Sequence, residues 1–253
     1  MSLIAKILEA KQSELESLRS QSLPPPPPRR ELALSRAAGE PLRIIAEIKF
    51  RSPSAGSLST HLSVAERASV YEKNGARMVS VLCDGGFFDG AYSHLAEARR
   101  GCSLPLLCKE FVIDEAQLDA ARAFGADAVL LIVRCLTPRR LTELVAAARR
   151  RSLEPFVEVA SADEVPLALD AGADLIGVNA RDLDTLAMDG AGAEAILGQL
   201  PPTVTRVQLS GLRGPADVQR IAASRADAAL IGEALMRLED PAPLLSSLVA
   251  ATG

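Results

Sequence analysis

A repeated pattern constrains the fold of this chain more than any other feature. The tripeptide Gly-Ala-Asp, or a close variant of it, begins at positions 75, 125, 172 and 225, about 50 residues apart, and an apolar run follows each copy. A glycine at such a position is typical of a helix end, and a continuous apolar run is typical of a strand that is buried on both faces. Each interval has room for two strand–helix units. We therefore predict strands that start near residues 44, 77, 104, 127, 155, 174, 204 and 227.

Eight strand–helix units in a chain of 253 residues predict the α/β class and a closed (β/α)₈ barrel. A doubly wound open sheet is the alternative, but no Gly-x-Gly-x-x-Gly motif follows a predicted strand. We expect residues 1–253 to form a single barrel domain.

Residues 1–40 precede the first strand and are predicted to form a helical extension. An amphipathic pattern over residues 2–20 predicts a helix, and residues 31–39 are expected to form a second, short one. Five consecutive prolines, 24–28, lie between them and predict a stiff extended connector. We expect this connector to lie across the body of the protein, and an SH3-type ligand is the alternative interpretation.

Composition and charge argue against several classes of function. The net charge of −4 is unlike that of a nucleic-acid-binding surface, and no apolar run is long enough to span a membrane. The first ten residues are too charged for a signal peptide, and the four cysteines have no metal-binding spacing. We expect a cytoplasmic protein with reduced thiols, without a metal, a nucleic-acid partner or a membrane partner, and either monomeric or weakly homo-oligomeric.

Polar residues follow the apolar runs at the carboxyl ends of the predicted strands, where barrels of this class place their active sites. Lysines and carboxylates gathered there suit general acid–base chemistry, because burial raises the pKa of a carboxylate and crowding lowers that of a lysine. Turns that contain serine and glycine suit a phosphate group, although simple strand-to-helix geometry would also explain them. The candidates are Glu47 and Lys49 on strand one, Lys109 on strand three, Glu158 on strand five, Asn179 and Arg181 on strand six, Ser210 and Gly211 on strand seven, and Gly232 and Glu233 on strand eight.

Two further features bear on the placement of the site. Arg51–Gly56 is a loop of small residues with one guanidinium, which indicates a phosphate cradle or, alternatively, an ordinary turn with a surface salt bridge. Asp127, Asp174 and Asp227 precede their strands and therefore belong to the opposite end of the barrel. We interpret these three aspartates as stability residues. For Lys109 and Glu158, the alternative to a catalytic role is a structural ion pair.

Seven stretches distributed from the first strand to the end of the chain resemble one family closely. They are Ile45-Ala46-Glu47-Ile48-Lys49 with Ser52-Pro53-Ser54, Phe88-Asp89-Gly90, Cys108-Lys109-Glu110-Phe111, Val157-Glu158-Val159, Gly177-Val178-Asn179-Ala180-Arg181-Asp182-Leu183, Ser210-Gly211, and Ile231-Gly232-Glu233-Ala234-Leu235-Met236-Arg237. The family is indole-3-glycerol phosphate synthase of tryptophan biosynthesis, whose extra N-terminal helix is also matched.

The resemblance implies a barrel of the ribulose-phosphate-binding type and a ring-closing lyase. The family's substrate is 1-(2-carboxyphenylamino)-1-deoxyribulose 5-phosphate, a small sugar phosphate. A ring carbon attacks the ketone, and carbon dioxide and water then leave to give indole-3-glycerol phosphate. The family uses no metal or organic cofactor.

The resemblance also implies roles for the candidates. Lys109 and Lys49 resemble the acids that act on the ketone and the departing hydroxyl, and Glu158 resembles the group that exchanges protons during dehydration. Glu47 and Asn179 resemble orienting residues. The residues similar to the family's binding groups are Arg51, Ser210, Gly211 and Gly232 at the phosphate, Arg181 and Ser52 near the substrate carboxylate and phosphate, and Phe88, Phe111 and Leu130 or Leu131 around the aromatic ring. Glu233 is expected among the substrate- or phosphate-binding residues.

The chain departs from the family pattern at several positions, of which Leu209 matters most. The family usually has glutamate there, and losing one charge-assisted hydrogen bond slows a reaction about 10- to 150-fold. Asp84 and Glu110 stand where glutamate and aspartate are usual. The favoured interpretation is the synthase reaction. The alternatives are a paralog acting on a related, more apolar arylamino sugar phosphate, another ribulose-phosphate-binding barrel, or a sugar-phosphate-binding protein without turnover.

Overall fold

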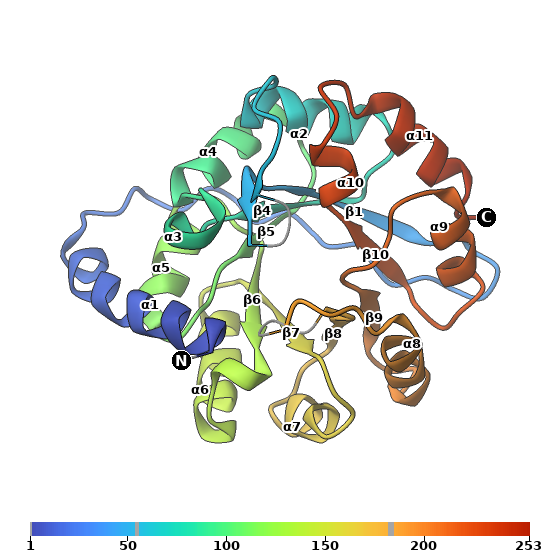
Figure 1. Cartoon of the computed structure of the whole chain (residues 1–253). Coiled ribbons are helices and arrows are strands. Elements are labelled where there is room, and N and C mark those ends of the chain that lie inside the picture. Colours follow the sequence, from blue (N-terminus) through green and yellow to red (C-terminus); the bar gives the residue numbers. More distant parts are fainter. Residues whose placement is uncertain (1, 54–55, 182–184) are drawn as a thin grey trace.

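The barrel predicted from the repeats is the central feature of the structure, a computed structural model that describes residues 2–53, 56–181 and 185–253. Eight parallel strands close into a ring in the order β1-β4-β5-β6-β7-β8-β9-β10, with β10 hydrogen-bonded to β1 (Figure 1). Every strand begins within two residues of its predicted start. The strands are β1 (Arg43–Ile48), β4 (Met78–Leu82), β5 (Leu106–Lys109), β6 (Ala128–Ile132), β7 (Glu154–Val159), β8 (Leu175–Val178), β9 (Thr205–Gln208) and β10 (Ala228–Ile231).

Helices surround this ring and alternate with its strands along the chain (Figure 1). Two short strands, β2 (Arg51–Ser52) and β3 (Gly56–Ser57), form a small antiparallel sheet after β1. No helix in the described part of the chain is long and apolar enough to span a membrane. The helices are α1 (Leu3–Ser20), α2 (Val64–Lys73), α3 (Gly85–Phe88), α4 (Tyr92–Gly101), α5 (Glu115–Ala123), η1 (Val133–Cys135), α6 (Pro138–Arg150), α7 (Glu164–Asp170), α8 (Gly190–Gln199), α9 (Pro215–Ala222), α10 (Glu233–Met236) and α11 (Ala242–Ala250).

The alternation of side chains along each strand divides the core into two clusters. Ile45 of β1 and Phe156 of β7 belong to the cluster inside the barrel, whereas their neighbour Ile44 packs in the layer between barrel and helices. Residues two apart in a strand share a face. Glu47 and Glu158 therefore follow Ile45 and Phe156 on the inner face, at the end of the barrel where the strands finish.

The proline connector lies against the barrel, as predicted, and does not project from it. The carbonyl groups of Pro27 and Pro28 accept hydrogen bonds from the guanidinium groups of Arg122 and Arg99. Helix α1, at the far end of this connector, packs against α5 and α3 outside the ring (Figure 1). From this connector the chain runs along the base of the barrel before it enters β1.

The prediction of a second helix over residues 31–39 is wrong, since this segment is extended and ends in a turn. The backbone N–H of Arg30 donates to Asp127 Oδ1 at 2.7 Å, and that of Arg36 donates to Asp227 Oδ1 at 3.5 Å. Leu34 lies between these anchors, 3% exposed, and packs into the inner cluster of the barrel. Hydrogen bonds to barrel carboxylates replace those of a helix, which local sequence patterns cannot anticipate.

We expect the aspartates at the base of the barrel to differ in their contribution to stability. Asp127 is fully buried and accepts hydrogen bonds from the N–H groups of Arg30 and Leu106 and an ion pair from Arg99 at 2.9 Å. Asp127→Ala should lower the free energy of unfolding by about 3 kcal/mol, because it removes the carboxylate that pairs with the largely buried Arg99 and leaves two backbone donors unpaired. Asp174 has a 76% exposed side chain and pairs only with Arg149 among the described ion pairs.

Asp174→Ala is the matched control and should have a much smaller effect, because solvent screens its ion pair. Urea unfolding followed by circular dichroism measures both variants. Equal losses of stability in the two variants would contradict the assignment.

Candidate active site

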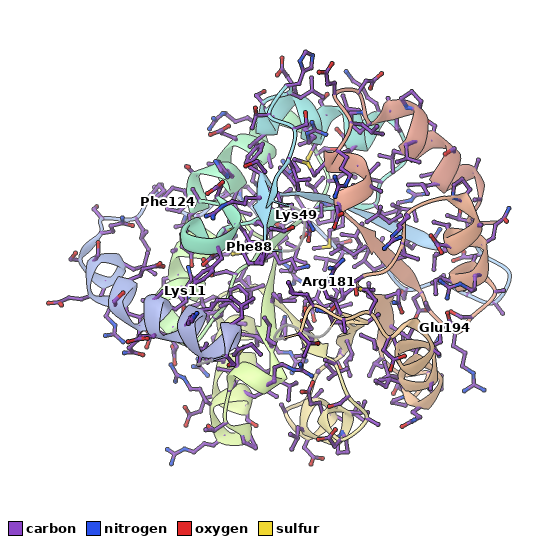
Figure 2. All side chains as sticks on the ribbon, viewed as in Figure 1. Lys11, Lys49, Phe88, Phe124, Arg181 and Glu194 are labelled. Carbon is purple, nitrogen blue, oxygen red and sulfur yellow. The ribbon has the colours of Figure 1, made fainter. Side chains whose placement is uncertain are left out.

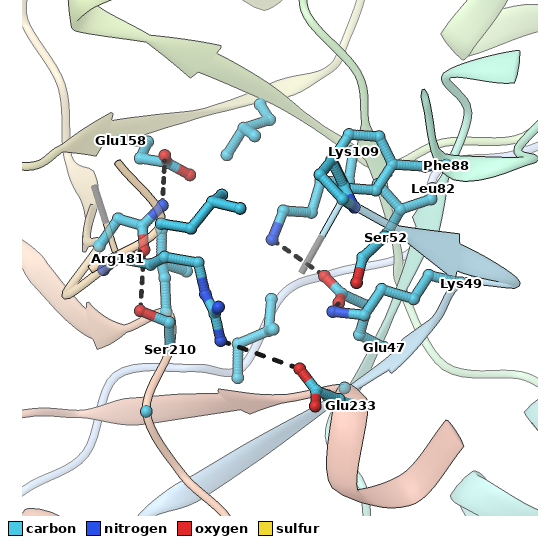
Figure 3. Close-up of a pocket in the computed structure, with 18 of the residues that line it drawn as sticks. Glu47, Lys49, Ser52, Leu82, Phe88, Lys109, Glu158, Arg181, Ser210 and Glu233 are labelled. Atoms are coloured by element: carbon cyan, nitrogen blue, oxygen red, sulfur yellow. Dashed lines mark hydrogen bonds and ion pairs between the residues drawn. The ribbon is translucent and has the colours of Figure 1, made fainter. Parts of the chain in front are cut away.

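A cavity of about 560 Å³ opens at the carboxyl ends of the strands and brings most of the predicted residues together (Figure 3). Residues from all eight strands of the ring, or from the segments that follow them, line it, together with two residues of α1. The predicted residues that line the cavity are Glu47, Lys49, Ser52, Phe88, Lys109, Phe111, Leu130, Glu158, Asn179, Arg181, Leu209, Ser210, Gly211, Gly232 and Glu233.

Glu47 lies between two ammonium groups. Its Oε1 is 2.8 Å from Lys49 Nζ, and its Oε2 is 2.9 Å from Lys109 Nζ. Burial alone would raise the pKa of Glu47, but Lys109 and Lys49 together lower it to about 2. Gly232 makes room for this carboxylate, because a Cβ at that position would lie 2.3 Å from Glu47 Oε1. Glu47 is therefore a fixed anion that holds both lysines.

Lys109 is a charged donor in this arrangement. Burial would lower its pKa, but the carboxylates of Glu47 and Glu158 outweigh that effect and raise it above the usual value. The prediction of a lysine with a lowered pKa is therefore wrong for Lys109. The reason is the number of carboxylates around one ammonium, which depends on how three strands meet.

Glu158 lies across the cavity from Glu47 and Lys49 (Figure 3), and it is hydrogen-bonded to Asn179. Burial raises the pKa of Glu158, against the opposing effects of Lys109 and of the Asn179 amide, which donates to Glu158 Oε1 at 2.9 Å. Ser210 Oγ donates to Asn179 Oδ1 at 2.8 Å and so fixes the orientation of the amide. The prediction of a carboxylate with a raised pKa is confirmed for Glu158 and wrong for Glu47.

The side of the cavity formed after β8, β9 and β10 combines small residues with cations. Ser210 and Gly211 follow β9, and Gly211 has a φ of +87°, which favours glycine. Arg213 and Arg237 also line the cavity, and sequence reasoning missed both as site residues. Arg213 lies two residues after Gly211, and this closeness to a predicted phosphate turn could have identified it as a site residue. Arg237 is held by Glu233 at 2.8 Å.

Two predicted residues do not reach the cavity. Arg51 faces away from it, paired with Asp89 at 2.9 Å and donating to the carbonyl of Gly86, while the next residue in β2, Ser52, lines the cavity. Leu131 packs between the barrel and the helices, and only its neighbour Leu130 faces inward. Alternation along a strand separates both pairs. Ser54 and Ala55 of the predicted cradle lie outside the described residues.

One wall of the cavity is apolar. The rings of Phe88 and Phe111 lie 6.0 Å apart, centroid to centroid, beside Leu130. Leu3 and Ile7 of α1 complete this wall. Sequence reasoning missed these two, because an amphipathic pattern shows that a helix has an apolar face but not which part of the barrel the face covers.

Leu209 occupies the inner face at the end of β9. It is 3% exposed and packs over Gly177, where a Cβ would lie 2.5 Å from Leu209 Cδ1. Gln208, the neighbouring polar residue, donates through its amide to the carbonyl of Ser210 and does not line the cavity. The inner position that the family fills with glutamate is therefore apolar in this chain.

Glu110 is a third buried carboxylate of the cavity, next to Lys109 in sequence. Burial raises its pKa to about 7, although Lys11 acts in the opposite direction. No group of three or more histidine, cysteine, aspartate or glutamate side chains within the described ranges is arranged to hold a metal ion.

A closed barrel with lysines and carboxylates converging on an enclosed mouth defines a (β/α)₈ barrel enzyme that performs acid–base chemistry. Comparison with known proteins places it more narrowly. A family model described as indole-3-glycerol phosphate synthase matches residues 4–248, and the chain belongs to this family.

Curated relatives agree with the family assignment. The chain is 46% identical to indole-3-glycerol phosphate synthase 2 of Streptomyces coelicolor, over 88% of this chain and 86% of the relative. It is 40% identical to the indole-3-glycerol phosphate synthase of an Exiguobacterium species, over 98% and 96% of the two chains. A solved structure of 3-hexulose-6-phosphate synthase, 17% identical, superposes with a TM-score of 0.67 over 84% of this chain and 100% of the other, which shows the shared fold.

We expect the raised pKa of Glu110 to make stability depend on pH. A group whose pKa is higher in the folded state than in the unfolded state stabilises the fold at low pH, and this contribution is lost as the pH rises through the folded-state value. For Glu110 the relevant interval runs from 4.5 to about 7. Across it, the free energy of unfolding of the wild type should fall relative to that of Glu110→Gln, by on the order of 1–3 kcal/mol.

Urea unfolding of both proteins at several values of pH across that interval tests the expectation. Parallel curves for the two proteins would show that Glu110 titrates normally.

Proposed function

We propose that this protein is an indole-3-glycerol phosphate synthase that closes the indole ring of 1-(2-carboxyphenylamino)-1-deoxyribulose 5-phosphate in tryptophan biosynthesis. The observation that carries the proposal is the placement of Lys109 between Glu47 and the facing Glu158 at the mouth of a family barrel. Family membership supplies the reaction class, and the cavity contains the groups that the reaction needs.

The chemistry follows from the charge state of each group. Lys109, held protonated by its carboxylate neighbours, donates a proton to the ketone oxygen as the ring carbon forms the new C–C bond. Carbon dioxide then leaves from that ring carbon and aromaticity returns. Lys49, the other ammonium on Glu47, donates to the hydroxyl as it departs as water. Glu158 accepts the proton released from the carbon attached to nitrogen, which completes the double bond of indole.

Binding is divided between two sides of the cavity. We assign the phosphate to the turns after β9 and β10, where Ser210, Gly211 and Gly232 offer donors and Arg213 and Arg237 supply positive charge. The arene belongs against the apolar wall on the other side. We place the remaining polar contacts to the substrate at Ser52, Arg181 and Glu233.

Turnover is the direct test. Formation of indole-3-glycerol phosphate from the carboxyphenylamino substrate, followed by indole fluorescence, should be detected for the wild type. Lys109→Ala should lower kcat by 10²-fold or more, because it removes the proton donor of ring closure. Lys6→Ala, an exposed lysine of α1, is the matched control and should leave kcat unchanged. An inert wild type would contradict the proposal.

Leu209→Glu tests the departure from the family pattern. We expect kcat/KM to rise, within the 10- to 150-fold range of one charge-assisted hydrogen bond, if the wild type uses the standard substrate with one polar contact missing. An inert wild type that Leu209→Glu does not improve would favour a different arene beside Leu209, since that side chain presents an apolar surface.

The pH profile tests the role of Glu158. A base must be ionised, so kcat/KM should fall as the pH drops through the raised pKa of Glu158. Asn179→Ala removes the amide that lowers this pKa and should shift the acid limb upward by on the order of 0.5–1 pH unit. Ser210→Ala retains the Asn179 amide and should shift the limb less. An acid limb that stays in place in Asn179→Ala would exclude Glu158 as the group observed.

A further inference from the structure

A buried lysine outside the cavity connects three elements of the structure. Lys11 of α1 is 1% exposed, and its ammonium lies 2.8 Å from Asp84 Oδ2 and 3.1 Å from Glu110 Oε1. It also contacts Glu14, one turn further along the helix, at 2.9 Å. Full burial of a lysine is costly unless it is paired, and breaking such a cluster leaves charges uncompensated. The sequence pattern gave no indication of it, because lysine is common on the polar face of a helix.

Asp84 and Glu110 each also accept hydrogen bonds from the backbone of the apolar wall. Asp84 Oδ1 accepts the backbone N–H groups of Phe87 and Phe88 at 2.6 and 3.2 Å, as the N-cap of α3. Glu110 Oε1 accepts the backbone N–H of Phe111 at 2.7 Å. One ammonium therefore fixes two carboxylates, and these carboxylates fix the backbone of both phenylalanines whose rings form the wall.

The same helix contributes directly to that wall. Ile7 and Leu3 lie one and two turns before Lys11, at spacings of four residues, and both line the cavity. Residues four apart share one face of a helix. Lys11 therefore holds the face of α1 that closes the cavity. This face lies beside α3, and Figure 2 shows Lys11 and Phe88 in this region.

The phosphate side of the cavity is independent of this cluster. Asp84 and Glu110 follow β4 and β5, whereas the phosphate turns belong to β9 and β10. In the closed order of the ring, β5 lies opposite β9, and β1 separates β4 from β10. A change at Lys11 should therefore move one side of the cavity and leave the other in place.

We propose that Lys11 is a positioning residue for the aromatic half of the substrate: through Asp84 and Glu110 it holds Phe88, Phe111 and the inner face of α1 in the arrangement that receives the arene. The proposal deepens the proposed function and rests on it. Lys11 itself does not line the cavity, so its effect on binding passes through the residues that it holds.

Two ligands that differ in the arylamino group separate this role from general stability. The first is the ribitol phosphate formed by reducing the ketone of the carboxyphenylamino substrate, which binds without turnover. The second is ribitol 5-phosphate, which lacks the arylamino group. Titration calorimetry on the full chain measures the Kd of each ligand, with the concentration of folded protein determined by circular dichroism.

For Lys11→Met we expect the Kd of the arylamino ligand to rise on the order of tenfold to a hundredfold, with the Kd of ribitol 5-phosphate changed less than about twofold. Lys6→Met is the matched control, the same substitution at an exposed position of the same helix, and should change neither Kd. Asp84→Asn retains an oxygen for the cap of α3 but removes the charge facing Lys11. Its affinity for the arylamino ligand should fall selectively, but less than in Lys11→Met. This variant therefore tests the proposal even if Lys11→Met does not fold.

The outcomes separate this proposal from the proposed function. Equal weakening of both ligands in Lys11→Met and Asp84→Asn, or no weakening of either, overturns the positioning role while binding of the arylamino ligand to the wild type still supports the function. A wild type that binds ribitol 5-phosphate but not the arylamino ligand overturns both proposals.

Discussion

The mouth of this barrel depends on one buried anion, the carboxylate of Glu47. It is held ionised by two ammonium groups and in turn holds Lys49 and Lys109 where the substrate ketone must lie. Removing it would leave two neighbouring ammonium groups without the carboxylate that they share. Its own position depends on the missing side chain at Gly232, directly after the neighbouring strand β10. The reactive geometry is therefore set by the closure of the ring between the first and last strands.

The two ends of the barrel use carboxylates for different purposes. At the base, Asp127 and Asp227 accept hydrogen bonds from the backbone that follows the proline connector and from the starts of neighbouring strands. They therefore hold the N-terminal extension against the barrel. At the mouth, the same residue type faces a cavity, and the outcome depends on its partners. Glu47 pairs with two lysines, which lower its pKa. Glu158 is near one lysine, which it shares with Glu47, and one amide, and burial outweighs both and raises its pKa.

Two departures from the family pattern are explained by a common partner. Asp84 is one methylene shorter than the usual residue and Glu110 one methylene longer, and both bind the ammonium of Lys11. The departure at Leu209 is not compensated by the neighbouring polar residue, because Gln208 faces away from the cavity.

The sequence by itself determined the barrel, the strand positions and the inward direction of Glu47, Lys109 and Glu158, because the repeats and the two-residue period of a strand are local properties. The extended course of residues 31–39, the direction of the Lys109 pKa and the burial of Lys11 were decided only by the tertiary structure. Each depends on a carboxylate that lies far away in the chain, and the number of charges around a group is set by how distant strands and helices meet.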